Sequence, residues 1–280
     1  FVQDEIELMN GRLILSPGIR YDDFEAKATS DAIYLAGNPG ISAPEDFSDS
    51  EVTAKLGVVY EFTSDLSIYG NVSEGFRAPP YDDVNVGFTN FIGGYKTISN
   101  AALESETSIG YEIGTRLRGG WGSVNVAVFK NDYENFIESL ATAPAFADSG
   151  GIDPADGLLT FQSVNLSEVE IKGLELSGEW SLAPLNDSLE GSAFKFALAY
   201  AEGENIAAAE PLDSIEPLSA VFGLTYDAPS GKWGGDLVFS LAKGKDASDI
   251  NSTSARNETS GYGSLDLMSY LQVSDSVRVN

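Results

Sequence analysis

The sequence predicts an all-β protein, an antiparallel transmembrane β-barrel built from long strands. The dominant pattern in the 280 residues is an alternation of apolar and polar side chains with a period of two. Many alternating stretches continue for about ten residues, and a tilted strand that crosses a membrane needs about 9–11, against about 5–6 in ordinary sheets. Short turns also alternate with long loops, which is typical of outer-membrane barrels.

About ten such strands follow one another, with little sign of a helix. The alternating stretches cover residues 12–21, 52–62, 66–73, 108–118, 123–128, 174–180, 193–200, 219–227, 235–243 and 262–272. We expect short connections at 61–65, 118–122 and 228–232, and long ones at 22–50, 78–105, 140–160, 202–216 and 244–260. No boundary of a second domain is visible, so residues 1–280 are predicted to form a single domain.

The alternation separates an apolar face from a polar face. Leu174, Leu176 and Trp180 alternate with Glu175 and Glu179. A charge at the bilayer midplane costs a barrel about 2–4 kcal/mol, so the uncharged face is expected to contact lipid and the charged face to line a wet lumen. Aromatic residues near strand ends are predicted to form girdles at the two membrane interfaces; these are Tyr21, Tyr60, Tyr69, Trp180, Tyr200 and Tyr226.

A soluble protein offers an alternative explanation of the same pattern. The two inner faces of a β-sandwich show the same period-two alternation. The competing hypothesis is therefore a secreted or surface β-sandwich that binds carbohydrate or mediates adhesion. Strand length and the contrast between short turns and long loops favour the barrel.

The composition excludes several classes of function. Neither histidine nor cysteine is present, so the catalytic triads that depend on them cannot form. Paired carboxylates such as Asp22 with Asp23 fall in expected loops or at strand ends, where solvation is their ordinary state. We therefore expect no catalytic residue, no bound metal and no enzyme activity.

The net charge of −27 also bears on the partners of the protein. Binding to a phosphate backbone needs clustered Lys and Arg, so nucleic acid is not expected. Three explanations of the acidity stay open: solubility in a salty habitat, an acidic lumen or outer loops that attract cations, and a calcium-binding adhesin. No Asp-rich calcium loop of the EF-hand type supports the third.

The most informative segment is the strand at 66–73 and the residues that follow it. Phe76, Arg77 and Ala78 lead into Pro79 and Pro80. Two prolines remove backbone donors and fix φ, so they are predicted to end the strand. The end of a strand, with the loop beyond it, is where binding surfaces are usually built.

Phe76-Arg77-Ala78-Pro79 resembles the FRAP box of TonB-dependent outer-membrane receptors, the family that takes up haem and haemoglobin iron. Further segments are similar to the C-terminal half of these receptors, in the expected order; they are residues 13–24, 85–98, 103–114, 172–176 and 261–267. The similarity extends over nearly the whole chain. It implies a receptor in the bacterial outer membrane that captures an iron-containing nutrient for TonB-driven import.

The resemblance also sets expectations about architecture and partners. Receptors of this family close with 22 strands, so this chain is expected to supply about half of the barrel and to lack the plug domain. We expect the fragment alone not to be the functional unit. The implied partners are outer-membrane lipid, the TonB complex through the missing plug, and an iron-carrying ligand or host haem protein.

The resemblance has two departures that affect the ligand. The second family box appears as Ser99-Asn-Ala-Ala-Leu103, without its proline, and the histidine that commonly holds haem between the boxes is missing. Tyrosine can ligate haem iron, so Tyr81 and Tyr95 are candidate substitutes; the alternative is that each is a stacked aromatic residue of the loop. No cofactor is predicted; haem or a ferric siderophore would be a transported ligand.

Arg77 has two interpretations. It pairs with Glu74 or Asp82, or it contacts an anionic group such as a haem propionate. The predicted ligand-binding residues are Phe76, Arg77, Ala78, Pro79, Tyr81 and Tyr95.

Overall fold

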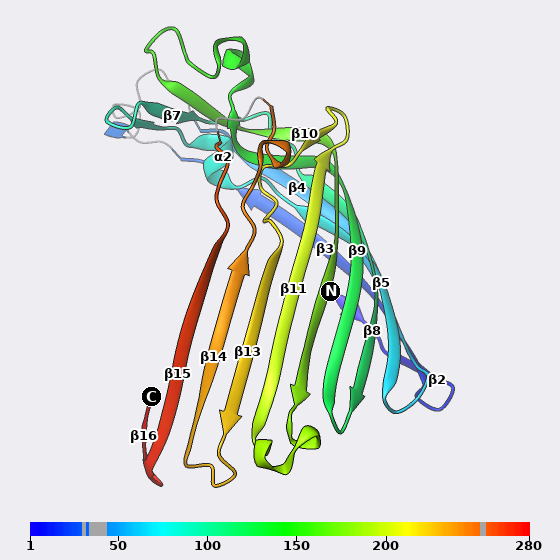
Figure 1. Ribbon diagram of the computed structural model, residues 1–280. Helices are drawn as coiled ribbons and strands as arrows, with labels where there is room; N and C mark the ends of the chain where they lie inside the picture. Colours follow the sequence, from blue (N-terminus) through cyan, green and yellow to red (C-terminus); the bar gives the residue numbers. More distant parts are fainter. Residues whose placement is uncertain (30–31, 34–43, 253–255) are drawn as a thin grey trace.

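The computed structural model describes residues 1–29, 32–33, 44–252 and 256–280, and their strands form one sheet of 16 strands (Figure 1). The long strands are β3 (Leu13–Ala26), β4 (Phe47–Glu61), β5 (Leu66–Arg77), β8 (Glu106–Gly119), β9 (Gly122–Thr142), β10 (Leu159–Ser181), β11 (Ser192–Asn205), β13 (Ser219–Asp227), β14 (Trp233–Ala242) and β15 (Tyr262–Ser274). These long strands confirm the predicted all-β fold.

Short elements complete the chain. The short strands are β1 (Val2–Gln3), β2 (Ile6–Leu8), β6 (Phe88–Asn90), β7 (Tyr95–Ile98), β12 (Glu210–Pro211) and β16 (Val277–Val279). The α-helix α2 (Tyr81–Asn85) and the 3₁₀ turns η1 (Pro144–Ser149), η2 (Ala183–Leu185), η3 (Asp187–Leu189) and η4 (Ala247–Asp249) lie in the connections. Within the described ranges, no helix is long and apolar enough to cross a membrane.

The sheet is an open, curved arc. The long strands pair antiparallel with their neighbours along the chain, from β3 at one side to β15 at the other, and the described part of these two strands is not paired together. The arc is therefore a partial barrel, and the described residues contain no plug-like domain. A β-sandwich needs two packed sheets, so the continuous single sheet overturns that alternative.

The two ends of the sheet differ as predicted. Figure 1 shows tight connections at one end of the strands and larger, partly helical connections at the other. The turns at 62–65, 120–121 and 228–232 are short. The connection between β10 and β11 also lies at the short-turn end, and it is longer because η2 and η3 fold within it.

The strands β9 and β10 are much longer than predicted, with 21 and 23 residues. The sequence suggested a loop from about residue 140 because the alternation fails there. Asn135 and Leu140 adopt positive φ values of 54° and 58°, and the register between β9 and β10 shifts at Gln162/Val164. A bulge changes the face to which later side chains point, so the period of two disappears although the strand continues.

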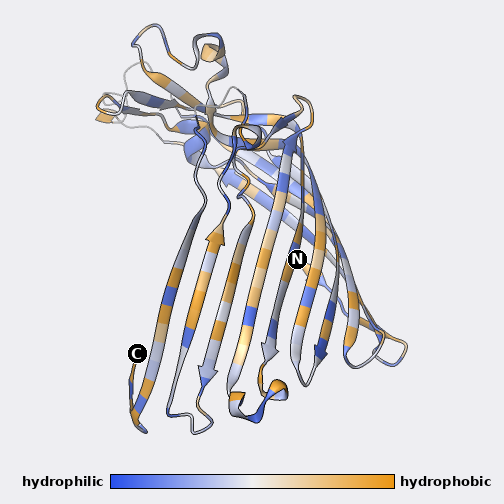
Figure 2. Cartoon of the chain, viewed as in Figure 1, coloured by the Kyte–Doolittle hydropathy of each residue, from blue (hydrophilic) through white to orange (hydrophobic). Residues whose placement is uncertain are grey.

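The apolar and polar faces follow the predicted alternation. Figure 2 shows hydrophobic residues recurring along the long strands, with hydrophilic ones between them. Leu174 and Trp180 are exposed, as an outward face requires. Trp180 packs against Trp121 and Phe196, with ring centroids 5.8 and 5.9 Å away, at the short-turn end of the sheet.

Tyr69 does not belong to the predicted aromatic girdle. Its ring lies under Arg116, 4.6 Å from the guanidinium carbon, and its hydroxyl donates to Asn125 Oδ1 at 3.4 Å. An odd-numbered residue on β5 points to the face opposite the apolar Ile68 and Val72. Tyr69 is therefore part of the polar face, and the girdle prediction is wrong for this residue.

Candidate ligand-binding site

The helix that follows the first family box packs against the second box. Strand β5 ends at Arg77, as the two prolines predicted, and helix α2 follows them directly. Val84 of α2, Leu103 at the end of the second box and Ile137 of β9 form a cluster in which each side chain is only 3% exposed. Pro79 is also fully buried. This small core holds the start of the longest connection against the sheet.

Arg77 contacts Glu106, and the predicted pairing with Glu74 or Asp82 is wrong. Arg77 Nη1 lies 3.6 Å from Glu106 Oε2, because the register of β5 and β8 places the two residues opposite each other. The same carboxylate oxygen accepts the Ile137 backbone N–H at 2.9 Å. Glu74 instead accepts the backbone N–H of Ala54 at 2.8 Å.

Asparagines fix the outer connections, a role that the sequence interpretation missed. Asn165 Nδ2 donates to the carbonyl oxygens of Glu104 and Asn135 at 3.0 and 2.7 Å, and its Oδ1 accepts the Glu104 N–H at 2.9 Å. Asn100 Nδ2 donates to the Ser163 carbonyl at 2.9 Å. Asn100 stands in the second box, so hydrogen bonds secure that segment although the family proline is missing.

A partly buried cation, Lys96, joins two of the connections. Lys96 Nζ lies 2.6 Å from Asp153 Oδ2 and 2.8 Å from Asp156 Oδ2, and its side chain is 15% exposed. Burial lowers the pKa of the Lys96 ammonium, but the hydrogen bonds to both carboxylates outweigh this effect and raise its pKa overall. The same hydrogen bonds lower the pKa of Asp153 and of Asp156. The lysine therefore attaches the segment after η1 to β7.

The strand β7 has an unusual position. It pairs in parallel with the start of β10, where Leu159 lies opposite Tyr95 and Gln162 opposite Ile98. The pairing of β10 with β11 ends at Val169. The first residues of β10 therefore pair with β7, where β11 no longer reaches. The chain between the two boxes thus folds back onto the sheet as the hairpin of β6 and β7.

Tyr95 lines a cavity of about 560 Å³ between β7, the ends of β9 and β10, and the connections that follow β11 and β14. Its ring centroid lies 6.3 Å from that of Phe88 and 6.4 Å from that of Phe161, which also lines the cavity. Leu140 and Leu212 add apolar surface. A concave, largely apolar space with a few polar groups is the usual form of a small-molecule site.

Charged groups stand at one side of this cavity. Burial raises the pKa of the Glu138 carboxyl, the nearby Asp213 raises it further, and Arg256 opposes the shift. Ser214 Oγ donates to Glu138 at 3.5 Å, and Arg256 Nη1 donates to the Asp213 carbonyl at 3.1 Å. The cavity therefore presents aromatic rings together with a guanidinium and carboxylates.

The predicted site residues are divided between two places. Phe76, Arg77, Ala78 and Pro79 lie at the end of β5, where Arg77 contacts Glu106. Tyr81 is the first residue of α2 and is 38% exposed. None of these five lines the cavity around Tyr95.

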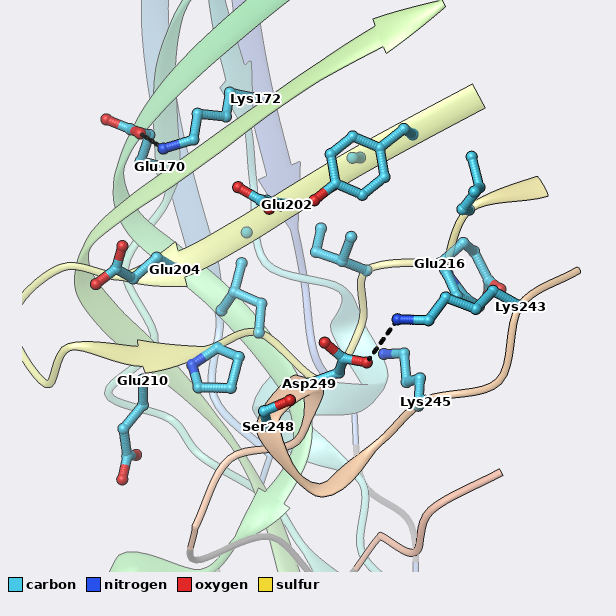
Figure 3. A pocket seen from close by; sticks show the side chains of 18 of the residues that line it. Glu170, Lys172, Glu202, Glu204, Glu210, Glu216, Lys243, Lys245, Ser248 and Asp249 are labelled. Carbon is cyan, nitrogen blue, oxygen red and sulfur yellow. Dashed lines mark hydrogen bonds and ion pairs between the residues drawn. The ribbon is translucent and has the colours of Figure 1, made fainter. Parts of the chain in front are cut away.

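A second cavity, of about 360 Å³, lies beside β11 (Figure 3). Figure 3 shows acidic and basic side chains gathered around it from β10, β11 and the connection after β14. Lys172 contacts Glu170 at 3.0 Å, Lys243 contacts Asp249 at 3.8 Å, and Tyr200 donates to Glu202. Tyr200 is the one aromatic residue that lines it, so it offers a flat ligand less stacking surface than the cavity around Tyr95, which Tyr95 and Phe161 line.

Over the described ranges, no three His, Cys, Asp or Glu residues come together in a way that could hold a metal ion.

The open arc of long antiparallel strands, with short turns at one end and larger connections at the other, is the architecture of part of an outer-membrane-type β-barrel. The family profile of the TonB-dependent receptor-like β-barrel matches residues 1–280, and the chain belongs to this family. The family consists of transport receptors and is not a class of enzymes.

Several curated proteins are similar to this chain. Hemoglobin-haptoglobin utilization protein B of Neisseria meningitidis serogroup C is 27% identical over 293 residues, which is 96% of this chain and 35% of the relative. Hemoglobin and hemoglobin-haptoglobin-binding protein A of Haemophilus influenzae is 26% identical over 83% of this chain and 22% of the relative. The chain thus spans about a third or less of the length of these relatives.

Solved structures share the fold. The copper transporter OprC superposes with a TM-score of 0.70 at 19% identity, over 95% of this chain and 37% of that structure. A ferric enterobactin receptor from Pseudomonas aeruginosa gives a TM-score of 0.67 at 20% identity, over 99% of this chain and 37% of that structure. At this level of identity the similarity establishes the architecture alone.

Proposed function

We propose that this chain is part of an outer-membrane receptor that captures an iron-containing nutrient, such as haem, haemoglobin or a siderophore, for TonB-driven import. The cavity around Tyr95 is the observation that carries the proposal. It is formed by the larger connections of the barrel, and it combines aromatic rings with the Arg256 guanidinium. Membership of the receptor family and the haemoglobin binding for which the relatives are named support the same assignment.

The proposal includes the partners of the complete receptor. The apolar outer face contacts outer-membrane lipid, and TonB acts through a plug supplied by the rest of the protein. The connections capture the ligand, and import follows when the plug moves. No step of this process requires a catalytic residue.

Tyr95 and Arg256 give the cavity its chemistry for haem. A phenolate oxygen is an established axial ligand of haem iron, and a guanidinium pairs well with a propionate. Tyr95 stands between Phe88 and Phe161, so a flat, apolar ring system finds stacking surfaces beside the phenol. In this proposal Phe76 to Pro79 hold the connection between β5 and β8 in place. Tyr81 lies outside the cavity and is exposed, so it is not the residue that ligates the iron.

A haem titration of the purified receptor, followed by absorbance, tests the proposal. Tyr95→Phe should change the spectrum of the bound haem and weaken binding about tenfold or more, since it removes only the ligating oxygen. Tyr81→Phe is the matched control and should leave the spectrum of the complex unchanged. No haem-dependent change in the unmodified receptor would remove haem as the ligand.

Growth on a single iron source tests the wider proposal. A strain that depends on this receptor should grow on haem, haemoglobin or a ferric siderophore, and should fail when TonB is deleted. Growth on none of these sources would overturn the proposed function.

A further inference from the structure

The strands β4 and β5 separate before either of them ends. Their ladder stops at Lys55 opposite Ser73, although β4 continues to Phe47 beside β3, and β5 continues to Arg77 beside β8. Figure 1 shows β3 to β5 slanting behind the more upright β11 to β15. A gap therefore opens within the sheet, on the side of the larger connections.

The edge of β4 that faces this gap carries backbone donors without a neighbouring strand in the described part of the chain. The N–H groups of Ser50 and Val52 reach only carboxylates of the preceding residues, Asp49 Oδ1 at 2.8 Å and Glu51 Oε1 at 3.1 Å. At Ala54, where the next ladder bond would form, the Glu74 carboxylate replaces the strand. Three alternate N–H groups thus bond to side chains that can rotate away.

A cavity of about 550 Å³ occupies the gap. β4 lines it with Glu51, Val52 and Thr53, and β5 lines it with Glu74 and Gly75. This cavity shares no lining residue with the one around Tyr95, so the two surfaces are separate. Val52 is 51% exposed, which leaves the edge accessible.

The charge of the cavity selects the kind of occupant. Six carboxylates line it, from Glu51, Glu74, Asp132, Glu134, Glu168 and Glu170. The one lysine among the lining residues, Lys130, already contacts Asp132 at 3.1 Å and Glu170 at 2.9 Å. The excess of negative charge attracts basic side chains and repels acidic ones.

We propose that the edge of β4 from Ser48 to Ala54 binds an extended, basic segment of a partner protein by strand addition. Carbonyl oxygens of the incoming segment would replace the carboxylates on the N–H groups of Ser50 and Val52. The freed Asp49 and Glu51 then pair with Lys or Arg of the segment. Backbone pairing supplies affinity, and the alternating side chains supply specificity. This inference concerns a protein partner and does not depend on the identity of the iron nutrient.

Fluorescence anisotropy with a labelled Lys-Val-Lys-Val-Thr-Val-Lys peptide tests the proposal on the intact receptor in detergent. A second peptide of identical sequence carries N-methyl groups at alternate residues, so it keeps the charge and cannot pair along one edge. The unmodified peptide should bind at least tenfold more tightly than the methylated one. Equal affinities would overturn strand addition, and so would absence of binding by both peptides.

Variants of the receptor give a second, independent measurement. Val52→Pro removes one N–H on the gap side and no ladder bond to β3, and it should weaken binding at least tenfold. Glu51→Gln should weaken binding several-fold, whereas Asp65→Asn, at the short-turn end, removes the same charge and should have no effect. Unchanged affinity in Val52→Pro, with the variant folded, would contradict the proposal.

Discussion

At the scale of single residues, Glu106 is the central polar group under the outer connections. Its carboxylate is buried, accepts the Ile137 N–H and faces Arg77 on the neighbouring strand. It thus ties β8 to the bulged part of β9, beyond the point at which their ladder ends at Glu134. Arg77 is partly exposed and partly neutralises the Glu106 carboxylate. The hydrogen bond from the Ile137 N–H to that carboxylate matters more, because a buried backbone donor needs an acceptor.

Glu106→Ala should therefore destabilise the folded receptor more than Arg77→Ala. The first change leaves a buried N–H without an acceptor, which costs about 1–3 kcal/mol, and the second removes a half-exposed ion pair worth less than about 1 kcal/mol. Urea unfolding in detergent, followed by tryptophan fluorescence, measures both. Equal losses would show that the ion pair, and not the bond to Ile137, is the dominant interaction.

The attachment through Lys96 should depend on pH only at the extremes. The lowered pKa values of Asp153 and Asp156 give stabilisation that is present above about pH 4 and is lost as the pH falls through their folded-state values. The raised pKa of Lys96 gives stabilisation that is present below about pH 10 and is lost as the pH rises through its folded-state value. Between these limits the attachment is constant.

Limited proteolysis of the segment at 143–158 measures this attachment. Cleavage should be slow from about pH 5 to 9 and faster in acid. Lys96→Met should give fast cleavage at every pH, whereas Lys195→Met, which removes an exposed lysine 3.8 Å from Glu179, should not. Slow cleavage of Lys96→Met would mean that other contacts hold the segment.

At the scale of elements, the connection from β5 to β8 is organised by its small core. Val84, Leu103 and Ile137 join α2, the second box and β9. Leu103→Ala should cost about 2–5 kcal/mol of local stability, because it leaves a cavity where no neighbour can collapse easily.

Hydrogen exchange resolves that loss by segment. Amides of α2 should exchange faster in Leu103→Ala, while those in the paired middle of β8 keep their protection. Leu189→Ala, in η3 at the short-turn end, is the matched control and should leave α2 unchanged. Faster exchange across all of β8 would indicate that the core supports the whole sheet.

The same elements show how far sequence reasoning reaches. Leu174 and Glu175 alternate plainly, so faces, strands and short turns were predictable from local pattern. Bulges at Asn135 and Leu140 hid the extension of β9 and β10. The contact of Arg77 with Glu106 depends on register across two strands, and the cavity around Tyr95 needs five separate segments to meet. Bulges and contacts between distant segments leave no periodic pattern in the sequence, so local pattern could not predict them.

At the scale of the whole molecule, the open arc has one face suited to lipid and one suited to water. Leu176→Lys, on the apolar face of β10, should reduce the stability of the inserted barrel by about 2–4 kcal/mol. Ser177→Lys, one residue away on the polar face, is the matched control and should change it little.

Folding of both variants of the complete receptor into lipid vesicles, titrated with urea, measures the difference. Similar losses for the two lysines would contradict the assignment of the faces. A detergent requirement for extraction of the unmodified protein from membranes is expected from the same exposed apolar surface.

The length of β10 has a consequence for the reach of the receptor. Its 23 residues are about twice the 9–11 that a tilted strand needs to cross a membrane. The apolar band of such barrels is only about 25 Å tall, so roughly half of the strand extends beyond the lipid. The cavity at Tyr95 is carried at its tip. The cavity at Tyr95 therefore lies beyond the apolar band of the membrane, in the aqueous layer outside it.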